Sequence, residues 1–180
     1  EIELVPINAD DGILRTYRLA LACTGEYAQY HLNDQGIPSN ATDEVKKAAV
    51  LTAMNTAMTR VNGIYENEIA VTMTIVANNT DIIFLNAASD PYTNNNGGTM
   101  LGQNQSTIDA TIGSANYDIG HVFSTGGGGI AGLGVVCSNN NKARGVTGLP
   151  SPIGDGFYVD FVSHEMGHQF RANHTQNNNC

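Results

Sequence analysis

Two histidines four residues apart constrain the fold of this chain most strongly, in the segment His164-Glu165-Met166-Gly167-His168. Residues at this spacing lie one helical turn apart, so both imidazoles project from the same side of a helix. At about 100° per residue, the opposite side of that helix is apolar. Its apolar residues are Val159, Val162, Met166 and Phe170. The pattern predicts a helix that packs on a core through this side and turns both histidines toward a cleft.

Glu165 lies beside the first histidine, where a carboxylate reaches a metal-bound water without binding the metal itself. Zinc lowers the pKa of such a water toward about 7 and polarises a carbonyl group. A carboxylate in this place takes the proton of the water and later passes it to a leaving amine. The alternative is a chance pattern on an ordinary helix, and a third metal ligand would separate the two interpretations.

His174 is the best candidate for this third ligand. It lies six residues after His168, within reach if the helix ends near Arg171 and the chain turns back. A second kind of zinc site takes a glutamate from a later helix, but only six residues follow His174 and none is acidic. The predicted site therefore consists of three zinc ligands, His164, His168 and His174, with Glu165 as the base.

The rest of the chain predicts an α+β fold, in which one mixed sheet of about five strands packs against helices. Thr42 is the expected N-cap of a long helix that runs to about Tyr65, with Asp43 and Glu44 in its first turn. Apolar alternation and turn residues predict further strands over 13–23, 69–75, 117–124, 130–137 and 143–147, with an apolar run at 82–85 that extends the second of them or forms a short strand. Further helices are expected over 103–114 and from Asp155, as the cap, to about residue 171.

Length and charge limit the classes of function. A chain of 180 residues fits one domain, 1–180, with a hydrophobic core. Its net charge of −9 disfavours nucleic acid and anionic membrane surfaces as partners, because both carry negative charge. Only 14% of its residues are charged, and neutral polar residues fill the loops, which favours a secreted, extracellular protein. The sequence does not define an oligomeric state.

Three other features have mainly structural interpretations. His121 falls within an apolar strand, which favours a packed core histidine over a metal ligand. The loop 86–102 contains Asp90 and several asparagines, so calcium is a weak expectation there, but the regular spacing of an EF-hand is missing and a plain surface loop is favoured. The three cysteines Cys23, Cys137 and Cys180 predict either one bridge and one thiol or three thiols.

At the histidine motif the sequence resembles the metzincin metallopeptidases, and among them the reprolysin-like (adamalysin) branch. The family pattern His-Glu-x-x-His-x-x-Gly-x-x-His is matched by His164, Glu165, His168 and His174. The segments 117–137 and 143–147 are similar to the reprolysin strands that precede the active-site helix. The resemblance implies a metzincin-like, mixed and twisted sheet with a long active-site helix, and a zinc-dependent endopeptidase that cleaves protein or peptide substrates.

The resemblance also implies where substrate lies. Residues 130–137 correspond to the edge strand of the cleft, and an extended substrate would add to it as a further strand. The expected substrate-binding residues are Ile130, Ala131, Gly132, Leu133 and Gly134. A cysteine that follows the edge strand pairs in the family with one near the end of the domain, which implies a bridge between Cys137 and Cys180.

Two departures from the family bear on activity. Arg171 replaces the glycine at which the chain leaves the helix with positive φ, so either Arg171 is strained or the turn is made differently, with Asn173 taking part of the bend. The sequence ends at Cys180 without the methionine turn of the family, so the C-terminal Met-turn subdomain is expected to be absent from this chain. The alternative function is therefore a zinc-binding but catalytically incompetent domain that acts as a binding module.

Overall fold

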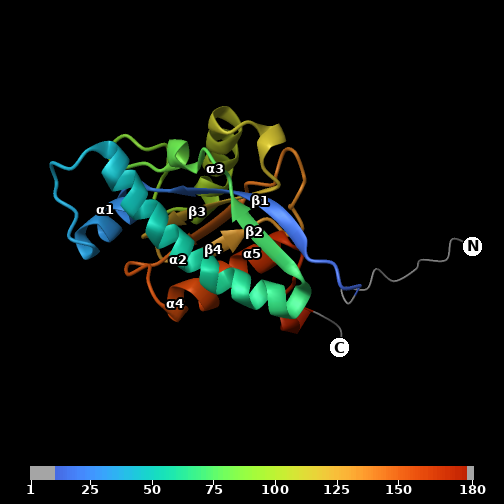
Figure 1. Ribbon diagram of the computed structural model, residues 1–180. Helices are drawn as coiled ribbons and strands as arrows, with labels where there is room; N and C mark the ends of the chain where they lie inside the picture. The colour runs from blue at the N-terminus through green and yellow to red at the C-terminus, as the bar shows by residue number, and fades with distance from the viewer. Residues whose placement is uncertain (1–10, 178–180) are drawn as a thin grey trace, which may run out of the picture.

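A computed structural model describes residues 11–177 and shows an α+β fold around one five-stranded, twisted sheet (Figure 1). The strand order is β2-β1-β3-β5-β4. Neighbouring strands are parallel except for β4, which runs antiparallel to β5 and forms one edge of the sheet. The fold class predicted from the sequence is confirmed. The strands are β1 (Arg15–Cys23), β2 (Val71–Ile75), β3 (Ile119–Ser124), β4 (Gly128–Ala131) and β5 (Gly145–Gly148).

Helices cover both faces of the sheet (Figure 1). One face carries α1 (Gly25–Asp34), α2 (Asp43–Ile69) and the final helical segment, and the other carries α3 (Gly97–Thr111). Short 3-10 turns, η1 (Asn79–Ile82), η2 (Ser114–Asn116) and η4 (Thr175–Asn177), connect these elements. Among the helices of residues 11–177, none combines the length and the apolar character that a membrane crossing requires.

The central strand β1 separates two hydrophobic cores. Leu19 and Leu21 pack with α1, α2 and the final helical segment, whereas Ala20 and Ala22 face α3. All four side chains are fully buried. Small alanines on the second face let α3 approach the sheet closely, and the larger leucines fill the space under α2. The alternation predicted for residues 13–23 is therefore confirmed, with both faces buried, as expected for a central parallel strand.

The long helix α2 follows the predicted start. Thr42 Oγ1 accepts a hydrogen bond from the amide of Val45, and two acidic residues occupy the first turn. The helix ends four residues later than predicted, at Ile69. It is terminated by Ala70, which adopts the left-handed conformation at φ 52° and whose amide donates to the Tyr65 carbonyl.

Three further elements differ from the sequence predictions. Helix α1 was not predicted, although Thr24 caps it as Thr42 caps α2. Helix α3 begins six residues earlier than expected. Two glycines at its start disfavour a helix, but the Asn96 side chain accepts a hydrogen bond from the amide of Thr99 and caps the first turn. The apolar run at 82–85 forms only one bridge, between Cys23 and Ile83, after the 3-10 turn η1.

The expected strand over 130–137 is much shorter, since β4 ends at Ala131. Beyond it, the amides of Gly134 and Val135 donate to the carbonyls of His168 and Gln169, both at 2.9 Å. These carbonyls lie in the last turn of a helix, where the regular donors four residues further along the chain are missing, and the His168 carbonyl also accepts from the Arg171 amide. The segment after β4 therefore leaves the sheet because its amides cap the final helix.

The final helical segment consists of three parts, namely α4 (Asp155–Phe157), a π-helical stretch η3 (Tyr158–Ser163) and α5 (His164–Gln169). Asp155 is its first residue and not its cap, since Gly154 precedes it and the Asp155 carboxylate pairs with Arg60 at 2.9 Å. Val162 and Met166 are fully buried against α2 and the sheet, as the sequence predicted.

A buried polar network fixes α5 to the sheet. The Gln169 amide nitrogen donates to the Gly120 carbonyl at 2.9 Å, and its oxygen lies 2.7 Å from Nδ1 of His121. Because that oxygen only accepts, Nδ1 of His121 carries a proton, and Nε2 accepts from Thr147 Oγ1 at 2.8 Å. A Cβ at Gly145 would collide with both Gln169 and His121, so only glycine leaves room for the network. The interpretation of His121 as a core histidine is confirmed.

This network predicts a loss of stability in mild acid. Burial lowers the pKa of His121 to about 4, whereas an exposed histidine in the unfolded chain titrates near about 6.5. Both states hold His121 neutral above about pH 6.5, and below it only the unfolded state gains the proton. The free energy of unfolding should therefore fall between about pH 6.5 and 4, by about 3 kcal/mol from this group.

Urea unfolding at several pH values, with a chelator present so that metal release does not contribute, measures this slope. The His121→Asn variant is the comparison, because it keeps every other titrating group. Equal slopes in the two proteins between pH 6.5 and 4.5 would exclude His121 as the source.

Candidate metal centre

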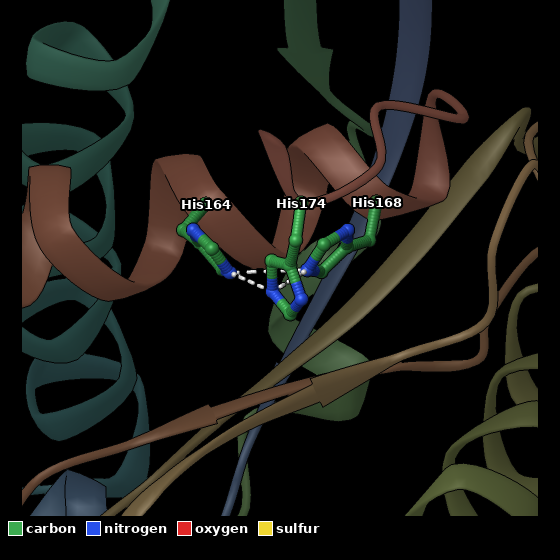
Figure 2. Close-up of side chains that lie close together, drawn as sticks. All are labelled: His164, His168 and His174. Atoms are coloured by element: carbon green, nitrogen blue, oxygen red, sulfur yellow. Dashed lines mark hydrogen bonds between the residues drawn. The ribbon is translucent and has the colours of Figure 1, made fainter. Parts of the chain in front are cut away.

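His164 and His168 project from α5 on the side away from the core, one helical turn apart (Figure 2). Their Nε2 atoms lie 3.0 Å apart. At the junction between the π-helical stretch and α5, Tyr65 of α2 donates its hydroxyl to the Ser163 carbonyl at 2.8 Å. The position of the first histidine is therefore set by α2 as well as by its own helix.

His174 joins the pair because the chain reverses directly after α5. Arg171 adopts φ 80°, and its amide donates to the His168 carbonyl at 2.8 Å. Nε2 of His174 then lies 3.1 Å from Nε2 of both other histidines (Figure 2). Of the two alternatives left by the sequence, the turn is the one with a strained Arg171, and it brings the third histidine into place.

The three nitrogens suit a metal ion. Nitrogens held at about 2.0–2.1 Å from one zinc ion at tetrahedral angles lie about 3.3 Å from one another, close to the observed separations. Nδ1 of His168 donates to the Ala172 carbonyl at 2.7 Å, so its Nε2 carries the lone pair that faces the other two rings. Burial, and then the proximity of the other two histidines, lowers the pKa of His164 and favours the neutral form that binds metals. Within residues 11–177 no other histidine, cysteine or acidic residues converge in this way.

Glu165 lies on the side of α5 that faces the sheet edge, and it is only 7% exposed. Burial raises the pKa of its carboxyl group, and the neighbouring His168 has a smaller, opposite effect. Its carboxylate rests against Gly129 of β4, where an added Cβ would lie 2.6 Å from Oε1. Glycine at this position in the edge strand therefore makes room for the predicted base.

The residues expected to bind substrate lie along the same edge. Ile130 and Ala131 belong to β4, and Gly132, Leu133 and Gly134 form the turn that follows it. Ile130 and Leu133 are 39% and 53% exposed, which is high for large apolar side chains. A cavity of about 560 Å³ lies between α5 and the end of α2, is lined in part by the three histidines and is open to solvent.

Sequence reasoning did not identify Gly129 or Gln169 as contributors to the site. Gly129 ends a run of four glycines, a composition that indicates a flexible connection and not a strand beside a catalytic base. Gln169 directly follows a predicted ligand, and its position three residues after Met166, on the predicted apolar side of the helix, was the available signal.

Two weaker expectations gain no support. Both carboxylate oxygens of Asp90 accept backbone hydrogen bonds, from Gly25 at 2.7 Å and Tyr92 at 2.9 Å, so the loop has the contacts of a structural turn and calcium is unsupported. Cys137 is exposed, whereas Cys180 lies outside the described residues, and the implied bridge between them stays a prediction.

The α+β fold has a twisted mixed sheet with an antiparallel edge strand, and its last helix carries two histidines that are followed by a third. These features are those of a metzincin-type metallopeptidase. The sequence model of the reprolysin-like metallopeptidase family M12B matches residues 51–175. The chain therefore belongs to this family. A search of curated proteins found no match.

The geometry predicts one zinc ion per chain with a strong dependence on His174. Replacing His174 by alanine removes one of three ligands, and the zinc dissociation constant should rise more than about 100-fold, since even indirect contacts to such ligands are worth 10–100-fold. Competition with a chromogenic chelator measures the affinity. Thr175→Ala, next to the ligand and exposed, should bind as the native chain does. Equal affinities for native chain and His174→Ala would show that the third histidine is not a ligand.

Proposed function

We propose that this protein is a zinc-dependent endopeptidase that hydrolyses peptide bonds, with His164, His168 and His174 as ligands and Glu165 as general base. The observation that carries the proposal is the position of Glu165. It follows the first ligand directly, yet its carboxylate lies between the ligand side of α5 and the edge strand β4. A purely structural metal site has no use for a buried carboxylate beside its ligands.

The chain's own groups have separate tasks in this reaction. A zinc ion bound by the three histidines would supply a Lewis acid that polarises the scissile carbonyl and acidifies water. Glu165 would take the proton of the attacking water and donate it to the leaving amine. The open edge of β4 would hold an extended substrate through backbone hydrogen bonds.

Removal of the base tests the proposal. Glu165→Ala should bind zinc as tightly as the native chain but cleave casein or a peptide library about 10²- to 10⁴-fold more slowly. A chelator should abolish cleavage by the native chain. Glu66→Ala, which removes an exposed carboxylate of α2, is the matched control and should cleave normally.

Two outcomes would contradict the proposal. Stoichiometric zinc without any cleavage would contradict the peptidase proposal and favour the alternative, a zinc-binding module without catalytic activity. Equal cleavage by Glu165→Ala and native chain would assign the activity to a contaminant. Secretion stays a prediction from composition, and detection of the expressed protein in the culture medium would test it.

A second test uses the contact between Gly129 and the base. Gly129→Ala places a methyl group against the Glu165 carboxylate, so the carboxylate must move. A displacement of about 1 Å can cost about 100-fold in rate, and we expect kcat to fall at least 10-fold with zinc affinity unchanged. Gly127→Ala is the matched control, because a Cβ there meets nothing within 4 Å. Normal turnover by Gly129→Ala would show that Glu165 does not act from its present position.

A further inference from the structure

Positive side chains are distributed unevenly in this acidic chain. Three of its five arginines form ion pairs with aspartates at 2.6–2.9 Å, and all three lysines donate to backbone carbonyls. The paired arginines are Arg15, Arg18 and Arg60. Among residues 11–177, no carboxylate or carbonyl accepts a hydrogen bond from the guanidinium of either remaining arginine, Arg144 or Arg171.

Both of these arginines lie at the end of the edge strand. Gly132 donates its amide to the Arg144 carbonyl at 2.8 Å, and a Cβ at Gly132 would lie 3.5 Å from Cβ of Arg144. The Arg171 side chain lies over Gly134, with Cβ, Cγ and Cδ 3.2–3.3 Å from where a Cβ of that glycine would stand. The glycines that follow β4 thus have an arginine beside each of them.

The end of the edge strand adjoins the metal centre. The His168 carbonyl accepts hydrogen bonds from Gly134 at 2.9 Å and from Arg171 at 2.8 Å, so both residues are one hydrogen bond from the backbone of a predicted ligand. An extended substrate advances about 3.3 Å per residue. A substrate side chain two or three positions from the scissile bond therefore lies within the reach of an arginine side chain at this end of the strand.

Arg171 also occupies a backbone conformation that disfavours it. A non-glycine residue at φ 80° is strained, and glycine would adopt this angle without cost. Strained residues concentrate at functional sites, where the side chain contributes something that an unstrained residue cannot. Here the strained residue carries a positive charge, and its side chain lies over Gly134 in the segment that follows the edge strand.

We propose that Arg171, together with Arg144, makes this end of the cleft select a peptide substrate with an acidic side chain two or three residues from the scissile bond. The inference rests on the proposed peptidase function for the place of the scissile bond. Arg171 is exposed to solvent, so the free energy of its ion pair with a substrate carboxylate falls in the range of surface ion pairs. This free energy corresponds to a preference of about three- to fivefold for Glu over Gln.

Positional peptide libraries test the preference directly. In each pair of decapeptide libraries, one position is fixed as Glu or as Gln and the others are mixed. Cleavage rates should favour Glu about three- to fivefold at one position on one side of the scissile bond, and less so as salt increases. The ratio should fall in Arg171→Gln, persist in Arg171→Lys, and reach about one in the double variant with Arg144→Gln. Arg60→Gln, which removes a distant paired arginine, should keep the native ratio.

A binding measurement separates this inference from the proposed function. Zinc-loaded Glu165→Ala is titrated into the same libraries, labelled with fluorescein, and anisotropy reports affinity without any cleavage. Tighter binding of a Glu library that is lost in the double variant supports the charge preference even if the native chain cleaves nothing. Equal affinities for Glu and Gln at every position, or a preference that survives the double variant, would overturn it.

Discussion

The site helix depends on one buried amide, that of Gln169. Helix α5 is only six residues long, and a helix of this length is not stable by itself. Gln169 connects it to β3 through the Gly120 carbonyl and His121, and through His121 to Thr147 of β5. All of these groups are buried, and loss of the amide would remove the partner of the Gly120 carbonyl and of Nδ1 of His121. These contacts therefore also fix the position of the predicted ligand His168, which precedes Gln169.

The residues of the short helix α5 lie in three different environments. Met166 is buried in the core, and Glu165 and Gln169 face the sheet. On the remaining side, His164 is exposed and His168 is half-buried. This division explains why a carboxylate and two imidazoles can be close together and yet differ in environment. The carboxylate is desolvated beside the edge strand, whereas the imidazoles keep access to an ion from solution. The geometry of the helix itself provides this separation, since consecutive residues point about 100° apart.

Local patterns predicted the parts of the fold that local forces decide. The strand β1, the start of α2 at Thr42 and the histidine pair each followed from a short stretch of sequence. Contacts between distant segments were not predictable in this way. Residues 132–137 have the composition of a strand, but Gly134 and Val135 cap a helix more than 30 residues further along the chain. The π-helical stretch before His164 and the contact between Gly129 and Glu165 are of the same kind, because each requires the packed fold.

Because Arg171 has a left-handed backbone, selection for stability and selection for substrate preference should favour different residues at this position. In a mutational scan of this position, a heat challenge should enrich glycine, which removes the strain, whereas growth that requires cleavage of acidic peptides should retain arginine. If both selections chose the same residue, the charge of Arg171 would have no value for substrate preference. If they differ as expected, adaptation of this protein to a hotter habitat would proceed through glycine at this turn and would be accompanied by a broader range of substrates.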